Sequence, residues 1–125
     1  MALTKEDMGE GWTRASIGSV TILYTNSTCH VYYTQGGSFS PAVQNTVAVY
    51  RTIDVAKNAF EKEKPQDVIL SYPNIGNECF LNDSAPINKL LVFRKGNVVA
   101  WVWLQQDKTG DILKYAKIVD QKITP

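Results

Sequence analysis

The sequence lacks a hydrophobic run long enough to cross a membrane. Its longest apolar stretch runs from Val98 to Leu104, far short of the roughly 20 residues that a transmembrane helix needs. It also lacks an excess of charge, because thirteen Lys and Arg residues accompany twelve Asp and Glu residues and the two signs are interspersed. A nucleic-acid-binding surface needs a dense basic stripe. We therefore expect neither a membrane-spanning segment nor a nucleic-acid partner.

Residues that carry metal or nucleophilic chemistry are also few, with one histidine and two cysteines. The paired C-x-x-C or H-x-x-x-H spacing of metal sites is absent, so we expect no metal and no other cofactor. Cys29 and His30 are neighbours in a predicted strand and point to opposite faces, which prevents them from acting as nucleophile and base. No catalytic residue is assigned. A small hydrolase or thiol-redox protein that uses Cys79 or His30 is the alternative hypothesis.

The two cysteines form an even count whose state depends on the cellular compartment. In an exported domain, Cys29 and Cys79 could form a disulfide that closes a loop of about fifty residues. In a reducing cytosol, both would be small buried hydrophobes. Two Asn-x-Ser/Thr sequons begin at Asn26 and Asn82 in polar, turn-like contexts, so these asparagines are candidate glycosylation sites.

The composition is that of a globular protein. The chain has 125 residues, of which 44% are hydrophobic and 20% charged, and this length suits one compact core. We find no internal repeat, low-complexity segment or linker. The sequence therefore predicts a single domain over residues 1–125.

Strand-like patterns dominate the first forty percent of the chain. Thr4 can cap one short helical turn, and extended chain is expected from Trp12. Residues 20–24 and 29–34 are rich in β-branched and aromatic side chains and predict a hairpin across residues 25–28. Residues 42–50 have the alternating pattern of a strand. Val43, Val47 and Val49 are on one face, and Ala48 and Tyr50 are on the other.

Two later segments have helical periodicity. Over residues 52–64, apolar side chains recur at helical spacing, Thr52 is a suitable N-cap and Pro65 prevents continuation. Over residues 110–123 an i, i+3, i+4, i+7 stripe predicts a helix that lies on a sheet; it comprises Ile112, Tyr115, Ala116, Val119 and Ile123.

Between these helices, short strands are predicted at residues 67–72, 75–81 and 87–94. Lys95-Gly96-Asn97 then makes a turn, and the chain returns as a strand over residues 98–104. Tight turns join strands in antiparallel pairs, and two separated helices are too few for repeated βαβ units. The predicted fold class is α+β, with a central antiparallel sheet and two main helices packed on it.

The last strand is apolar on both faces. Val98, Ala100, Val102 and Leu104 point to one side, and Val99, Trp101 and Trp103 point to the other. Trp101 and Trp103, with Tyr50 beside them, are candidate anchors for a ligand or protein partner, because indole rings combine apolar area with a polar edge. In the alternative interpretation, a helix or loop covers the tryptophans and they belong to the core.

Four short motifs of this sequence resemble segments of a known group of proteins. "LTKEDMGEGW", "VAVYRTIDVAKNAF", "IGNEC" and "LVFRKGNVVAWV" resemble a loose group of small exported prokaryotic domains, often lipoproteins of unknown function, that look related to the PsbP-like α/β/α sandwich. The resemblance implies an antiparallel sheet covered by helices. It also implies an extracytoplasmic location behind a cleaved signal or lipid anchor upstream of Leu3.

The resemblance brings no catalytic residues with it, since PsbP-like relatives act mainly as non-catalytic assembly or binding subunits. We therefore expect a non-enzymatic extracytoplasmic domain that binds a protein partner or a small apolar ligand through its aromatic sheet face. A homodimer formed through an uncovered sheet face is a further hypothesis.

Overall fold

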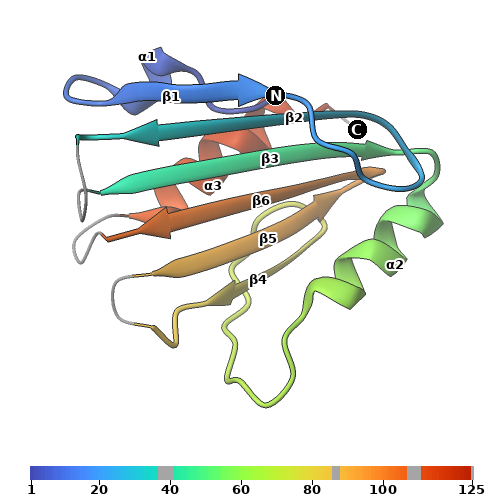
Figure 1. Ribbon diagram of the computed structural model, residues 1–125. Helices are drawn as coiled ribbons and strands as arrows, with labels where there is room; N and C mark the ends of the chain where they lie inside the picture. The colour runs from blue at the N-terminus through green and yellow to red at the C-terminus, as the bar shows by residue number, and fades with distance from the viewer. Residues whose placement is uncertain (37–40, 86–87, 107–110, 125) are drawn as a thin grey trace.

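The computed structural model describes residues 1–36, 41–85, 88–106 and 111–124. Its helices are α1 (Lys5–Met8), α2 (Ile53–Glu63) and α3 (Ile112–Lys122), and its strands are β1 (Thr13–Gly18), β2 (Thr25–Thr34), β3 (Ala42–Tyr50), β4 (Glu78–Asn82), β5 (Lys89–Lys95) and β6 (Val98–Gln105). These strands form one antiparallel sheet in the order β1-β2-β3-β6-β5-β4 (Figure 1). The predicted α+β class and both main helices are confirmed; residues 87 and 110 of the predicted elements lie outside the described part.

The sheet consists of two three-stranded meanders, β1-β2-β3 and β4-β5-β6, that join where β3 pairs with β6. In that central pair, Val47 lies opposite Ala100 and Thr46 lies opposite Trp101. Directly opposed residues of antiparallel strands share a face. This register therefore sorts the side chains of all the strands onto two faces.

The helix α3 covers one face of the sheet, behind the strands in Figure 1. Its residues Tyr115, Ala116 and Val119 are buried against the even-numbered side chains of β6 and the odd-numbered ones of β3. The rings of Trp12 and Tyr115 meet edge to face with centroids 6.4 Å apart. The apolar stripe of α3 therefore packs on the sheet face that includes the even-numbered side chains of β6, as both periodicities predict.

The N-terminal segment is fastened to this covered face by a buried asparagine. Asn45 accepts a hydrogen bond from the backbone N–H of Leu3 and donates one to the carbonyl of Trp101, both at 2.9 Å. The hydroxyl of Tyr33 donates to the carbonyl of Leu3 at 3.1 Å. A buried polar side chain is tolerated when its hydrogen bonds are made, so Asn45 fixes the beginning of the chain across the sheet.

An ion pair closes the same end of the molecule. Lys122 of α3 pairs with Asp7 of α1 and donates to the carbonyl of Ala2 at 3.1 Å. Burial of the Asp7 carboxyl opposes ionisation, but the hydrogen bonds from Lys122 and Thr4 outweigh it and lower the pKa of Asp7. The two ends of the described chain are thereby held side by side (Figure 1).

The helix α2 covers part of the other face, in front of the sheet in Figure 1. Thr52 caps it by accepting from the N–H of Val55 at 3.1 Å. Its buried Ala56 and Phe60 pack in a second core cluster, where the rings of Phe60 and Phe80 lie 5.6 Å apart. The remaining buried members of this cluster are Ala48, Tyr50, Val92, Val99 and Trp101.

Two of the predicted strands are wrong. Residues 20–24 form a connection instead of a strand, and β2 begins at Thr25, within the expected turn. β-branched threonines favour extended chain, so the segment 25–28 continues the strand that follows it. Residues 67–72 contribute only an isolated bridge between Ser71 and Leu81.

A glycine makes the close approach between β4 and β5 possible. Gly76 has a φ of 65°, and a Cβ at this position would lie 2.6 Å from the carbonyl oxygen of Arg94. That same oxygen accepts from the N–H of Asn77 at 2.7 Å. The Arg94 side chain donates to Glu78 at 2.5 Å and to the carbonyl of Gly96 at 2.8 Å, so this corner of the sheet is densely bonded.

Candidate functional site

An apolar groove lies between α2 and the connection of residues 19–24, which hooks toward that helix in Figure 1. We call it the α2 groove. Its volume is about 420 Å³, and most of its walls are apolar. The residues that line it are Ile22, Leu23, Tyr24, Tyr50, Val55, Asn58, Ala59 and Lys62. A concave, mostly apolar site with a few polar groups at its edge has the features of a small-molecule binding site.

Hydrogen bonds hold the outer wall of the α2 groove in place. The hydroxyl of Thr28 donates to the carbonyl of Val20 at 2.5 Å and accepts from its N–H at 3.0 Å. The hydroxyl of Thr25 donates to the carbonyl of Ile22 at 2.8 Å, and the N–H of Arg51 donates to the carbonyl of Tyr24 at 3.1 Å. The wall is therefore fixed to β2 and to the turn between β3 and α2.

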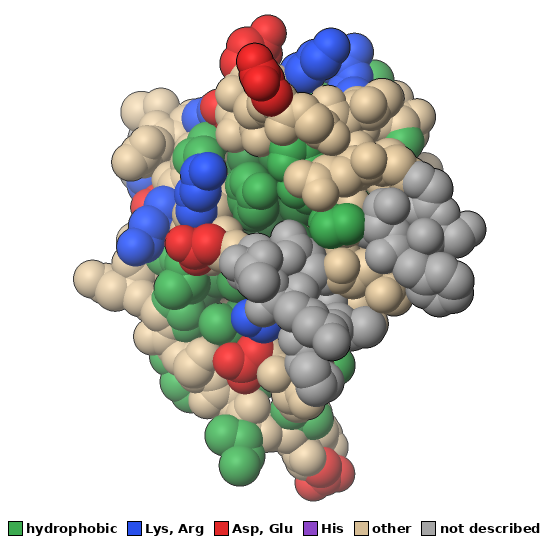
Figure 2. Space-filling model, turned by 90° about the vertical axis from the view of Figure 1, so that its left-hand side faces the viewer, with side chains coloured by type: hydrophobic (Ala, Val, Ile, Leu, Met, Phe, Trp, Pro, Cys, Tyr) green, Lys and Arg blue, Asp and Glu red, His purple; other side chains and the backbone are tan. Residues whose placement is uncertain are grey.

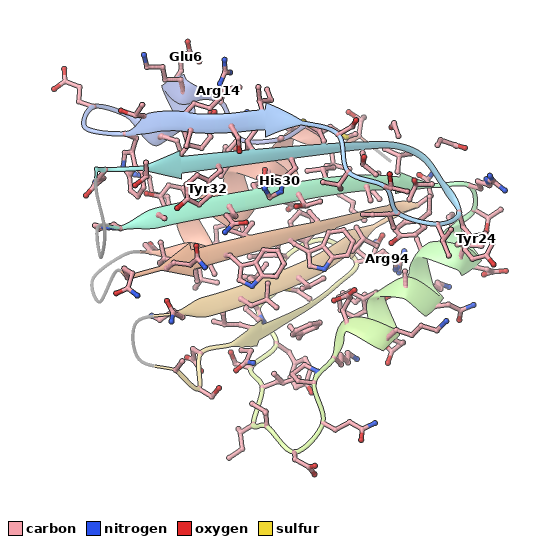
Figure 3. All side chains as sticks on the ribbon, viewed as in Figure 1. Glu6, Arg14, Tyr24, His30, Tyr32 and Arg94 are labelled. Carbon is pink, nitrogen blue, oxygen red and sulfur yellow. The ribbon has the colours of Figure 1, made fainter. Side chains whose placement is uncertain are left out.

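Two large apolar side chains stand exposed on this wall. Leu23 is 73% exposed and Tyr24 is 61% exposed; Figure 3 shows Tyr24 beside α2. Tyr24 also has a φ of 65°, a backbone conformation that costs an L-residue about 1–2 kcal/mol. Strained residues of this kind gather at functional sites, and the strain of Tyr24 coincides here with exposed apolar surface at the groove.

The floor of the α2 groove includes Tyr50, the last residue of β3. Tyr50 is buried, and its backbone is bound to Asn97 in both directions, through hydrogen bonds of 2.8 Å each. Burial, followed by the negative charge of Glu63, raises the pKa of the Tyr50 hydroxyl. The phenol therefore stays neutral over the physiological pH range and presents an uncharged surface.

A second cavity, of about 260 Å³, shares Ile22 with the α2 groove and extends along the sheet. Trp101 and Trp103 line it together with Thr46 and Glu63. Trp101 is only 6% exposed, whereas Trp103 is half-buried. Each of the predicted anchors thus borders one of these two cavities, but Tyr50 and Trp101 are chiefly core residues and do not form an open aromatic shelf.

Beyond these cavities, the sheet face carries half-buried polar and aromatic side chains. His30 and Tyr32 lie on β2 on this side (Figure 3). The ring nitrogen Nδ1 of His30 lies 2.7 Å from the hydroxyl oxygen of Thr46, in a hydrogen bond. This hydrogen bond gives His30 a structural partner on the neighbouring strand.

The structure places the two cysteines too far apart for a disulfide. Both are free, and they lie on one face in a row that crosses the sheet through Val47, Ala100 and Phe93. Four interstrand steps separate them by about 19 Å, whereas the Cα atoms of a disulfide lie within about 7 Å. Of the two states that the sequence left open for Cys29 and Cys79, the structure therefore has the free thiols and not the disulfide.

The fold does not bring Cys79 and His30 together for the thiol chemistry considered as an alternative. Burial, followed by the charge of Asp120, raises the pKa of Cys79 to about 12, so the nucleophilic thiolate is scarce at neutral pH. His30 is on the opposite face of the sheet from Cys79, four strands away.

We expect the two thiols to differ sharply in reactivity. In the folded protein at pH 8, Cys29 should react with 5,5′-dithiobis(2-nitrobenzoate), while Cys79 should react roughly a hundredfold or more slowly because burial suppresses its thiolate. Absorbance of the released thionitrobenzoate measures both rates, and a Cys29→Ser variant isolates Cys79. Unfolding in urea should make the thiols equivalent. Rapid labelling of Cys79 in the folded variant would restore the thiol-enzyme hypothesis.

The two sequons lie in different surroundings. Asn26 is exposed but belongs to β2, not to a turn, so that part of its prediction is wrong. Asn82 is half-buried at the end of β4, and its side-chain oxygen accepts from the N–H and hydroxyl of Ser84. Glycosylation of either stays a prediction.

The face of the molecule that Figure 2 presents is mixed in charge. The face in Figure 2 carries basic and acidic side chains beside hydrophobic ones, without a continuous basic stripe among the coloured residues. The described residues include no group of three or more His, Cys, Asp or Glu side chains arranged to hold a metal ion. Within the same ranges, each helix is too short or too polar for a membrane crossing.

Sequence patterns did not single out most residues of the α2 groove. Ile22, Leu23 and Tyr24 were assigned to a strand, in which they would have alternated between faces. The polar side of α2, with Asn58 and Lys62, has the composition of an ordinary solvated helix surface. Among the residues that line the groove, the sequence predicts only Tyr50 as a binding residue. The local signal for the groove wall is the apolar triplet of residues 22–24, directly before the polar residues 25–28.

The described fold is that of an α+β domain with an apolar groove beside its antiparallel sheet. Comparisons with models of known families, with curated proteins and with solved structures give no match. The PsbP-like relationship stays a prediction that rests on the short motifs.

Proposed function

We propose that this chain is a non-enzymatic binding domain that holds a small apolar ligand in the α2 groove. The observation that carries the proposal is the exposure of Leu23 and Tyr24 at the edge of an apolar cavity of about 420 Å³. Exposed apolar side chains that border a concave site lose contact with water when a ligand enters, which favours binding by about 25 cal/mol per Å². The fixed backbone of the wall supports the same conclusion, because a preorganised site loses little entropy on binding.

The proposal favours a small ligand over a protein partner because the apolar surface is hollowed. A protein interface of standard size covers about 800 Å² on each partner. The apolar residues at the α2 groove converge instead on one cavity between two segments. The extracytoplasmic location, with or without a lipid anchor, stays a prediction from the motif resemblance; a signal sequence or lipobox upstream in the reading frame would support it.

An uncharged fluorescent probe tests this proposal directly. N-phenyl-1-naphthylamine becomes brighter in apolar surroundings, and we expect the wild-type protein to bind it in a saturable manner. Leu23→Ser should weaken binding at least about fivefold because it removes apolar contact area. Tyr24→Asn should also weaken it while leaving the free energy of unfolding unchanged or higher, since asparagine tolerates a positive φ.

Ile69→Ser is the matched control, because Ile69 is 92% exposed and does not line the α2 groove. We expect this variant to bind the probe as the wild type does. The proposal is wrong if the wild type does not bind the probe, or if Ile69→Ser weakens binding as much as Leu23→Ser. Light scattering at two concentrations gives a second check: a dimer that Leu23→Ser dissociates would make a second copy of the chain the occupant.

A further inference from the structure

The α2 groove has one charged residue in its lining, Lys62, which lies at the C-terminal end of α2. Asn58 is one helical turn earlier, so the amide and the ammonium group lie on the same side of the helix. The other residues that line the groove are apolar or aromatic. Both polar groups therefore belong to one edge of an otherwise apolar site.

Among the described residues, Lys62 has no ion-pair partner. The described ion pairs join Lys64 to Glu61, Arg94 to Glu78, Lys95 to Asp120 and Lys122 to Asp7. Lys62 takes part in none of these, and no carboxylate lines the α2 groove within the described part of the chain. Glu63, the adjacent acid, lines the second cavity instead.

We infer that the ligand is an amphipathic anion, an inference that rests on the proposed function. Its apolar body lies between Ile22, Tyr50 and Val55, and its single anionic head group, a carboxylate or an equivalent, binds at Lys62 and Asn58. An ammonium group and an amide N–H₂ both donate hydrogen bonds, and an anion accepts them. Bonds of this charge-assisted kind are stronger than neutral ones.

The position of Lys62 is also favourable for the helix itself, because a cation in the last turn interacts with the helix dipole. That role concerns the stability of α2 and is independent of what lies in the groove. A test must therefore compare ligands that differ only in charge.

Two related probes provide this comparison. 1-Anilinonaphthalene-8-sulfonate has the same aromatic rings as N-phenyl-1-naphthylamine and carries in addition one sulfonate. We expect Lys62→Gln to weaken binding of the sulfonate about three- to fivefold, the effect of one partly exposed ionic contact, and to change binding of the neutral probe much less. In 0.5 M NaCl the difference should nearly disappear, because salt screens exposed charges.

Lys57→Gln is the matched control, since it removes the same charge from the same helix at an exposed position outside the groove lining. It should leave the affinity of both probes unchanged. If the neutral probe binds but Lys62→Gln affects the two probes equally, or affects neither, the anionic head group is refuted and the apolar site stands. If the neutral probe does not bind at all, the proposed function itself fails.

Discussion

Replacing Gly76 with alanine is expected to lower the free energy of unfolding by about 2–5 kcal/mol. A φ of 65° costs an L-residue about 1–2 kcal/mol, and forcing an added methyl group into a packed site costs a further 1–3 kcal/mol or so. The new Cβ would lie 2.6 Å from the backbone oxygen of Arg94 and 2.9 Å from the ring of Phe93. Since whole domains are stable by only about 5–15 kcal/mol, this change threatens folding itself.

The neighbours of Gly76 have little freedom to move away. The oxygen of Arg94 is held by the N–H of Asn77 at 2.7 Å, and Phe93 is fully buried. Urea denaturation followed by tryptophan fluorescence measures the loss. Gly11→Ala is the matched control, because Gly11 has a φ of 88° but nothing within 4 Å of an added Cβ. It should lose only the backbone contribution, about 1–2 kcal/mol. Equal losses in the two variants would contradict the close approach at Gly76.

Trp101→Ala is expected to destabilise the protein by about 3–5 kcal/mol, the usual cost of truncating a buried aromatic side chain. Trp101 is 6% exposed and packs in the core cluster beneath α2. Trp103→Ala should cost less, about 1–2 kcal/mol, because Trp103 is half-buried and buries less apolar area. Thermal unfolding followed by far-ultraviolet circular dichroism compares the two variants at equal concentration.

These two tryptophans had competing interpretations as partner anchors and as core residues. A large loss for Trp101 and a small one for Trp103 would assign Trp101 to the core and leave Trp103 as the accessible indole. Losses below about 1 kcal/mol for both would contradict the packing beneath α2. Trp101→Phe is a useful intermediate, because it keeps an aromatic ring and should lose only part of the stability.

The sequence correctly predicted the elements in which the spacing of apolar residues shows which side chains share a face. The alternation of Val47 and Ala48 in β3 assigned each residue to the correct core cluster. The stripe that contains Tyr115 and Val119 correctly predicted a helix on the sheet. In α3 the stripe arises because one face is buried and the other is not. In β3 both faces are buried, and the alternation divides the side chains between the two core clusters. Both patterns are local, so the sequence carries them directly.

The groove could not be predicted in the same way because it joins distant segments. Ile22 belongs to a connection, Tyr50 to β3 and Ala59 to α2, and only the complete fold brings them to one cavity. The segment 20–24 has strand-like composition, but Thr28 bonds to Val20 through its side chain and not through a strand ladder. The sequence left the state of the two cysteines open for a related reason: the order of strands, which separates Cys29 from Cys79, is a non-local property.

The junction between the two meanders has a consequence for synthesis on the ribosome. All three strands of the first meander are present once β3 has emerged, but one edge of β3 is then unpaired over its full length, since its partner there is β6, at residues 98–105. About fifty further residues must be translated before that edge is closed, a delay of several seconds at common elongation rates. Until then, the nascent chain exposes one edge of β3, a strand that is central in the finished sheet. A chaperone would protect the chain best during this interval.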